Sequence, residues 1–370
     1  QTALFAVEYS LAELWASLGV APAYVIGHSV GELAAACVAG AIWLDEGLRM
    51  VEARGRLMGS LEAKYTGADG GQRAQGVMAA VEASEELVRA ALFGESQRHP
   101  GESIGSRVSL AAVNGPEQVV ISGERESVEE LLAAMNATGH RGMRHKMLAV
   151  SNAFHSHIME PVLDEFEQEA TAVLGNDMTA KLSHRQPSDR AAARWAGVRL
   201  VSTATGRFVK LSHRQGVKCT VEGSSPAGSG TTDLDAGPDF GSVRYWLHQL
   251  RGTVMFSTAV RSVLDAGCRV FIEIGPQPAL LGMVAPLARS MQDSAPNLAT
   301  LLLLPSLRKF AVGGDWEAML TSIGKLYEDG AVEFDLATVF GVSSDATYDG
   351  NAGTAGVNAG SPLRQLCRVA

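Results

Sequence analysis

Hydrophobic positions along the first 58 residues predict helices separated by one short strand. Leu4, Leu11 and Trp15 recur at helical spacing, so a helix is expected over residues 1–18, with Gly19 as its left-handed cap. A strand and two further helices are expected next, over residues 24–26, 32–38 and 44–58. A strand that runs directly into an alanine-rich helix is typical of α/β proteins.

The pattern changes between residues 66 and 150, where short strands and helices of a second unit are expected. Strands are predicted over residues 76–81, 108–113, 118–122 and 143–150, and helices over 84–92 and 127–137. The order β-α-β-β-α-β is that of a ferredoxin-like fold. We therefore expect 66–150 to be a small subdomain inserted into a larger one.

The larger subdomain is expected to comprise residues 1–65 and 151–304. In its second part, strands are predicted at 198–202 and 269–274, and helices at 244–250 and 257–266. Strands that alternate with helices favour a mainly parallel sheet. Residues 216–241 are rich in Gly, Ser, Thr and Asp, and a mobile loop is expected at about 203–241. Residues 342–370 are expected to be a disordered tail or linker.

Composition narrows the class of protein. Of 370 residues, 31 are Lys or Arg and 40 are Asp or Glu, giving a net charge of −9, which argues against nucleic acid or an anionic membrane as the main partner. No apolar run reaches the roughly 18–20 residues of a membrane span. The four scattered cysteines form neither a disulfide framework nor a CxxC metal motif, so a reducing, cytoplasmic location is expected.

Ser29 is the candidate nucleophile. It is the central residue of a Gly-x-Ser-x-Gly motif between the predicted strand and helix, the setting required of a nucleophile elbow. Gly27 and Gly31 leave room for a sharp turn, and N–H groups at the helix start can stabilise an oxyanion. The alternative is an ordinary N-cap serine in a glycine-rich turn.

A serine nucleophile needs a base, and nine histidines are candidates. His28 adjoins Ser29 in sequence but is expected to point away along the turn. His155 stands where the small subdomain returns the chain to the large one, and a cleft is expected at such a junction. On this reasoning His157 remains an alternative.

Five segments resemble the malonyl-CoA:acyl-carrier-protein transacylases, and more narrowly the acyltransferase domains of polyketide or fatty acid synthases. The segments read GHSVGELAAACVAG, VEARGRLM, NAFHSHIMEP, YWLHQLRGTVMF and FIEIGP. The resemblance extends from Gln1 to about Asp335 and implies an α/β-hydrolase-like large subdomain. Its last part, from residue 305 onward, resembles the linker that follows such domains in multidomain synthases, and a linker is therefore expected over residues 305–341.

The resemblance also implies roles for single residues. Ser29 matches the acyl-carrying nucleophile and His155 the general base, with the backbone carbonyl of Gln249 orienting the histidine. The backbone N–H of Val30 matches an oxyanion donor. Arg54 matches the arginine that binds the malonyl carboxylate, a task suited to the two parallel donors of a guanidinium.

From the sequence alone, Arg54 could equally be a solvated helical arginine that pairs with Glu52 or a neighbour. Two further features of the resemblance concern substrate choice. Val30 after the serine and the triplet that ends in Phe154-His155 are similar to malonyl-selective members, and a bulky Phe154 could exclude an α-methyl group. His28 is expected to contribute to the substrate site.

The function implied is transfer of a malonyl unit from malonyl-CoA to the phosphopantetheine thiol of an acyl carrier protein. No bound cofactor or metal is expected, and a neighbouring ketosynthase is expected to be a partner. Related domains begin with a strand and a GQG-type loop that donates an oxyanion N–H, so this sequence is expected to be an N-terminally truncated fragment. Two alternatives remain: a serine esterase or thioesterase of the α/β-hydrolase class, and a non-catalytic docking domain.

Overall fold

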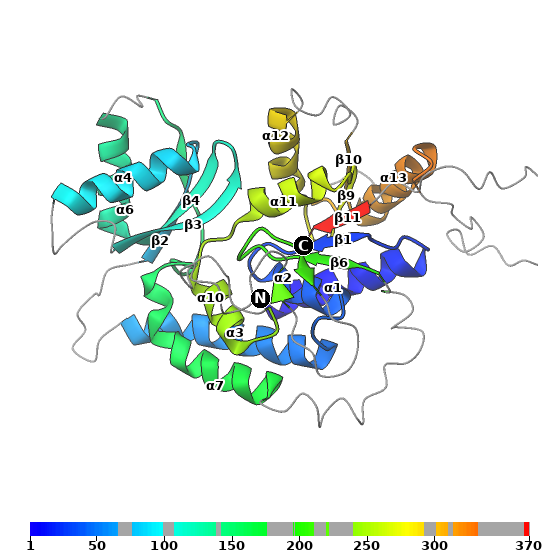
Figure 1. Cartoon of the computed structure of the whole chain (residues 1–370), viewed down its shortest axis with the longest axis horizontal. Helices are drawn as coiled ribbons and strands as arrows, with labels where there is room; N and C mark the ends of the chain where they lie inside the picture. Colours follow the sequence, from blue (N-terminus) through cyan, green and yellow to red (C-terminus); the bar gives the residue numbers. More distant parts are fainter. Residues whose placement is uncertain are drawn as a thin grey trace, which may run out of the picture.

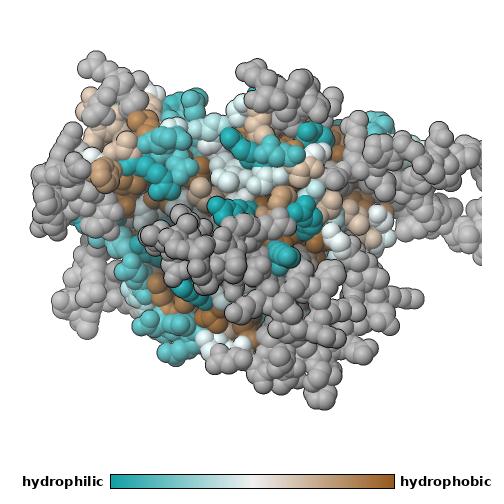
Figure 2. Space-filling view, in the orientation of Figure 1, coloured by the Kyte–Doolittle hydropathy of each residue, from teal (hydrophilic) through white to brown (hydrophobic). Residues whose placement is uncertain are grey.

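The computed structural model describes residues 1–65, 76–98, 107–137, 142–175, 195, 197–210, 220–221, 240–291, 301–309, 314–331 and 366–369. These residues form two main sheets with their own helices (Figure 1). On the face in Figure 2, hydrophilic and hydrophobic residues are interspersed over the described parts. No helix among the described residues is both long and apolar enough to span a membrane.

The larger sheet has five parallel strands in the order β10-β9-β11-β1-β6. Their bounds are Tyr24–Ile26 for β1, Arg199–Val201 for β6, Val270–Glu273 for β9, Leu302–Pro305 for β10 and Leu366–Val369 for β11. Because parallel strands share one carboxyl edge, the residues that follow β1 and β9 lie at the same edge of the sheet.

Helices cover both faces of this sheet. The first face packs against α1 (Thr2–Ser17), α2 (Gly31–Val38) and α13 (Gly314–Glu328), and the second against α11 (Phe256–Asp265) and α12 (Leu281–Met291). Beyond α2, the helix α7 (Leu163–Leu174) packs on both α3 (Leu44–Tyr65) and α10 (Val243–Arg251). The short 3-10 helix η1 (His157–Val162) joins this group.

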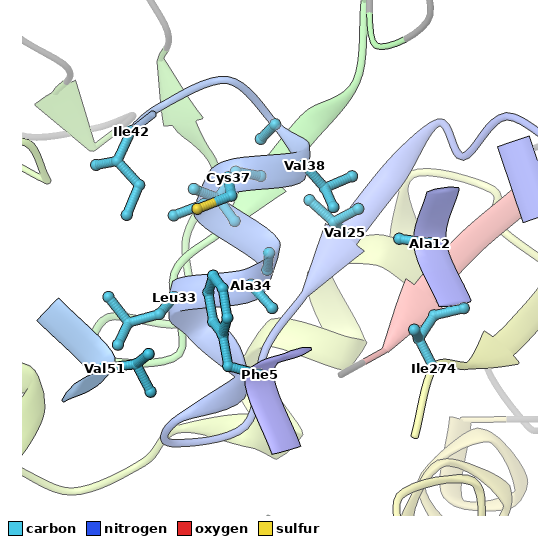
Figure 3. Packing of buried hydrophobic residues seen from close by; sticks show 14 of the residues in the cluster. Phe5, Ala12, Val25, Leu33, Ala34, Cys37, Val38, Ile42, Val51 and Ile274 are labelled. Carbon is cyan, nitrogen blue, oxygen red and sulfur yellow. The ribbon is translucent and has the colours of Figure 1, made fainter. Parts of the chain in front are cut away.

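The core around α2 explains why this helix is so rich in alanine. Figure 3 shows Leu33, Ala34 and Cys37 of α2 around the Phe5 ring of α1, with Val51 of α3 beside Leu33. Every residue of α2 is buried. Small side chains let α1 and α3 approach the helix closely, and the position of the turn before α2 is thereby fixed.

The second sheet is antiparallel, with strand order β3-β4-β2-β5. Its strands are β2 (Gly76–Val81), β3 (Val108–Gly115), β4 (Gln118–Glu124) and β5 (His145–Met147), and its helices are α4 (Glu85–Arg98) and α6 (Arg125–Ala137). These elements occur in the order that the sequence predicted, and they surround a separate apolar core.

The edge of β3 connects the two units. Ala112 pairs with Val254 in a parallel bridge, and Thr253 Oγ1 donates a hydrogen bond to Leu110 O at 2.7 Å. The segment between α10 and α11 is therefore held against the small sheet. This segment also carries Gly252, which contributes to the site described below.

Two expectations for irregular segments need correction. The tail predicted at 342–370 contains β11, which occupies the centre of the large sheet between β9 and β1. Four residues are too few for a periodic pattern, so nothing in the local sequence marks this strand. The loop predicted at about 203–241 contains a two-stranded ribbon of β7 (Val209–Lys210) and β8 (Thr220–Val221). The other residues of both segments, apart from 203–208 and 240–241, lie outside the described parts.

Candidate active site

The turn between β1 and α2 has a backbone conformation that L-residues seldom adopt. Ser29 has a φ of 53°, and His155 has a φ of 57°. These are the two non-glycine residues with positive φ in the described part of the chain. A Cβ on Gly27 would lie 2.2 Å from Glu32 N, so only glycine fits there. Such backbone strain costs on the order of 1–3 kcal/mol per residue and is concentrated at functional sites.

The two strained residues are hydrogen-bonded to each other. Ser29 Oγ lies 2.7 Å from His155 Nε2, and His155 Nδ1 lies 2.9 Å from the carbonyl oxygen of Gly252. A carbonyl accepts only, so Nδ1 carries the proton and Nε2 is free to accept from the serine hydroxyl. This tautomer is the one that a general base needs.

Burial keeps the His155 ring neutral. The pKa of His155 is lowered from 6.5 to about 3, first by desolvation and then by the nearby positive charge of Arg54. The imidazole is therefore neutral at pH 7, and its Nε2 lone pair is available to the serine hydroxyl. The pair can act as nucleophile and base in acyl transfer.

The residue that orients His155 differs from the expected one. The expectation was the Gln249 carbonyl, whereas the structure places that of Gly252 at the ring. Gln249 lies within α10, where carbonyls point along the helix axis; Gly252 follows the helix end in extended conformation, which turns its carbonyl aside. The Gln249 side chain has another contact, because its Nε2 donates to Ser29 O at 2.6 Å.

Arg54 is buried beside the nucleophile. Its side chain comes from α3, is 3% exposed, and donates from Nη2 to Ser29 Oγ at 3.1 Å and from Nη1 to Gln1 Oε1. Its Nε has no hydrogen-bond partner, and no carboxylate of the described residues forms a salt bridge with it. Burial lowers the pKa of Arg54 to about 10, so the guanidinium stays charged at pH 7. The predicted alternative, pairing with Glu52, is wrong, since Glu52 pairs with Arg56 at 3.3 Å.

The remaining predicted residues surround this group. His28 Nε2 donates to Asn114 Oδ1 of β3 at 2.9 Å, so the ring reaches toward the small sheet. Phe154 is half-buried and packs against both cores of the large unit, and Val30 is the residue before α2. His157 begins η1 with its Nε2 3.6 Å from Glu124, while the contact to Ser29 is made by His155.

Several residues of the site carried no assignment from the sequence. Glu32 has the clearest signal in retrospect, because it is the one charged residue in the alanine-rich run 32–38 and is fully buried. Thr203, Tyr245 and Gly252 come from distant segments and had no local signal. Among the described residues, no three His, Cys, Asp or Glu side chains are grouped so as to hold a metal ion.

Comparisons with known proteins agree with this geometry. The family model described as the acyl transferase domain matches residues 1–184. The mycoketide-CoA synthase of Mycobacterium tuberculosis (strain ATCC 25618 / H37Rv) is 35% identical over 309 residues, which are 84% of this chain and 6% of that protein. The chain therefore spans a small part of this curated relative.

Two solved structures have a similar fold. The acyltransferase domain from the second module of the salinomycin polyketide synthase is 31% identical with a TM-score of 0.65, over 94% of this chain and 64% of that one. The acyl transferase domain of SpnD, in complex with 2-(pent-4-yn-1-yl)malonyl, is 25% identical with a TM-score of 0.61, over 89% and 61% of the two chains.

Proposed function

Because this chain belongs to the acyl transferase domain family, whose model matches residues 1–184, we propose that it transfers a malonyl unit from malonyl-CoA to an acyl carrier protein. The acyl group would be held in between as an ester of Ser29. Malonyl-CoA and the phosphopantetheine thiol of the carrier are substrates, and the proposed chemistry uses only the protein's own side chains and backbone.

The buried guanidinium of Arg54 is the observation that carries the proposal. A cation that is 3% exposed and lies 3.1 Å from the nucleophile has, among the described residues, the neutral amide of Gln1 and the Ser29 hydroxyl as its hydrogen-bond partners. Burying an unpaired charge is costly, so such a site favours a ligand that supplies a carboxylate. A malonyl thioester carries a carboxylate close to the reacting carbonyl, whereas an acetyl thioester does not. Arg54 could bind it with two parallel N–H···O bonds.

In the first half-reaction, His155 Nε2 takes the Ser29 proton while Oγ attacks the thioester carbonyl. The resulting oxyanion would be held by the backbone N–H of Val30 at the start of α2. The carbon–sulfur bond then breaks, and the CoA thiolate leaves with the proton from His155. The product is the malonyl ester of Ser29.

The second half-reaction reverses these proton transfers. His155 takes the proton of the carrier thiol, and the sulfur attacks the ester carbonyl. When the carbon–oxygen bond breaks, Ser29 Oγ recovers the proton from His155. The Gly252 carbonyl holds the ring in the required tautomer throughout, since Nδ1–H is already engaged.

We assign the choice between malonyl and substituted malonyl groups to the residues that flank Ser29 and His155. Phe154 precedes the base and is half-buried between the two cores, so its ring has little freedom to move away from an α-substituent. Excluding one methyl group discriminates by about 1–3 kcal/mol. The SpnD domain is in complex with a substituted malonyl group, and this supports a carboxylated acyl group as the substrate of this fold. It does not support the choice of an unsubstituted malonyl group.

We also propose identities for the structural units and the neighbouring domains around the site. We assign the four-stranded unit as an inserted ferredoxin-like subdomain and the five-stranded unit as α/β-hydrolase-like. Residues 305–341 would be the linker to further synthase domains, and a ketosynthase would be among the neighbours. These assignments rest on element order and on the multidomain synthases to which the chain is similar.

The direct test is covalent labelling. The protein is incubated with malonyl-CoA carrying a labelled malonyl group, and Ser29 should become labelled, while the Ser29→Ala variant should not. Adding an acyl carrier protein should move the label to its phosphopantetheine thiol. Label that persists in Ser29→Ala would refute the nucleophile, and release of malonate faster than transfer would favour the esterase alternative. An intact fold that never acquires label would favour the docking-domain alternative.

A further inference from the structure

Glu32 is a fully buried acid three residues after the nucleophile, and four groups converge on it. Its Oε1 lies 2.9 Å from Thr203 N and 2.6 Å from the Tyr245 hydroxyl, and its Oε2 lies 3.0 Å from Thr203 Oγ1. The Gln249 side chain is its fourth hydrogen-bond partner. The carboxyl group thus joins α2 to the segment after β6 and to α10.

The hydrogen atoms around Glu32 can be counted. Thr203 Oγ1 has one hydrogen but two oxygen neighbours, Glu32 Oε2 at 3.0 Å and the Gly27 carbonyl at 2.8 Å. The Gly27 carbonyl accepts only, so the Thr203 hydrogen must go there for that contact to be a hydrogen bond. The second contact is then a hydrogen bond only if Glu32 itself is the donor. A protonated Glu32 satisfies both contacts, and an ionised one satisfies only one of them.

With a protonated Glu32, the hydrogen bonds form one chain in which each hydroxyl group donates to the next. Tyr245 donates to Glu32 Oε1 and can accept from Ser202 Oγ at 2.6 Å. A protonated Glu32 donates to Thr203, which donates to the Gly27 carbonyl. Four hydroxyl groups in series therefore end on the backbone of the nucleophile turn, with no hydrogen left over and no oxygen left unpaired.

Glu32 also reaches the other side of the turn through Gln249. The Gln249 amide has two hydrogens, and one of them is donated to the Ser29 carbonyl at 2.6 Å. Its contact with Glu32 uses the same amide group. The carbonyls of Gly27 and Ser29 are thus held by two residues that both depend on one buried acid.

We propose that Glu32 works as a neutral, hydrogen-bond-donating carboxylic acid and is a positioning residue that holds the Ser29 turn in its left-handed conformation. It acts through Thr203 and Gln249 and does not touch the reacting atoms. The inference rests on the proposed acyl transfer for its kinetic consequence only. The protonation state and the hydrogen-bond chain concern the folded protein whatever its substrate.

The electrostatic surroundings agree with a neutral acid below neutral pH. Burial is the main cause that raises the pKa of Glu32 to about 7, against the lowering effect of its hydrogen bonds. Tyr245 from α10 is itself buried with a raised pKa. The positive charge of Arg54 from α3 interacts with Glu32 and favours its ionised form, so burial acts against this interaction as well. Glu8 from α1 lines a small cavity with Ala34 and Ala35 of α2, on another part of the helix. Ionisation of Glu32 above about pH 7 would withdraw the donor from Thr203.

The first experiment is infrared difference spectroscopy at pH 6 on the wild-type protein and the Glu32→Gln variant. The wild type should show a protonated-carboxyl stretch that disappears in Glu32→Gln. It should also fade in the wild type as the pH rises through about 7. Absence of this difference band would overturn the neutral acid, and this result does not depend on any activity.

The second experiment compares Ser29 acylation by labelled malonyl-CoA in Glu32→Gln and Glu32→Leu. The amide can still donate to Thr203 and accept from Tyr245, so Glu32→Gln should keep most of the rate and should lose the alkaline decline of the wild type. Glu32→Leu should lower kcat by about 10–100-fold with little change in KM, as expected for a misplaced nucleophile. Equal losses in both variants, or an alkaline decline that persists in Glu32→Gln, would overturn the proposal.

Thr203 supplies a matched pair if Glu32→Leu fails to fold. Thr203→Ser keeps the hydroxyl and should keep the rate, whereas Thr203→Val keeps the shape and should lose kcat as Glu32→Leu does. Equal rates in the two variants would refute the chain of donors. If the wild type acquires no label, the proposed function fails, while the infrared result still decides the state of Glu32.

Discussion

Replacing Arg54 by alanine is the sharpest test of the carboxylate site. The guanidinium is 3% exposed, so a malonyl carboxylate that binds there without it would be buried and unpaired. Leaving one member of a buried ion pair without its partner costs about 3–5 kcal/mol. At 1.4 kcal/mol per factor of ten, kcat/KM for malonyl-CoA should fall by about 100–4,000-fold. The lost contact to Ser29 Oγ affects every thioester, at about 1 kcal/mol or roughly fivefold.

The two contributions separate when malonyl-CoA and acetyl-CoA are compared. Rates of Ser29 acylation are measured for both thioesters in the wild type, in Arg54→Ala and in Arg56→Ala. Arg56 lies on the same helix, but its side chain is 49% exposed, and it should leave both rates unchanged. Arg54→Ala should lose most of its preference for malonyl over acetyl. An equal loss for the two thioesters would refute a carboxylate-binding role and leave Arg54 as a partner of the nucleophile only.

Three further predictions concern the same site. Gly27→Ala should abolish Ser29 acylation because the added Cβ would lie 2.2 Å from a backbone atom. The control is Gly59→Ala, a helical position where the added Cβ has no atom within 4 Å. This variant should keep the acylation rate, and its free energy of unfolding should rise by about 0.5–1 kcal/mol. Gln1→Glu should lower acylation by malonyl-CoA at least tenfold relative to acetyl-CoA, since its carboxylate would occupy Arg54; an unchanged ratio would contradict this. Because burial lowers the pKa of His155 from 6.5 to about 3, the acylation rate should not fall as the pH drops through 6.5 in a pH–rate profile. The unfolded state, however, binds a proton below about 6.5, so the free energy of unfolding should fall as the pH drops from 6.5 toward 3.

Local pattern predicted most of the elements that position the site. The strand at 24–26 and the helix after Ser29 are where hydrophobic periodicity and the two glycines place them. Gly27 is required by the close approach of Glu32 N, a constraint that the Gly-x-Ser-x-Gly spacing expresses directly. The sequence therefore determines the turn, because every atom involved lies within six residues.

Contacts between distant segments could not be derived in the same way. Reasoning from the residues left His155 and His157 as alternatives, and the structure brings His155 to Ser29 because its left-handed backbone turns the ring inward. The orienting carbonyl belongs to Gly252 because β3 of the small unit holds the adjoining segment, a pairing between residues over 140 positions apart. No periodicity within either segment contains that information.

The central position of β11 has a consequence for biosynthesis. Within the described part of the chain, the pairs β10–β9 and β1–β6 are joined through β11 alone. The last residue of β11, Val369, is translated 96 residues after Glu273, the last residue of β9. At about 5–20 residues per second, a ribosome needs roughly 5–20 s to cover that distance. Throughout this interval the nascent chain would present two unpaired sheet edges, one on β9 and one on β1. Unpaired edges can pair with strands of other chains, so the order of synthesis defines a time window in which these two edges are open to such pairing.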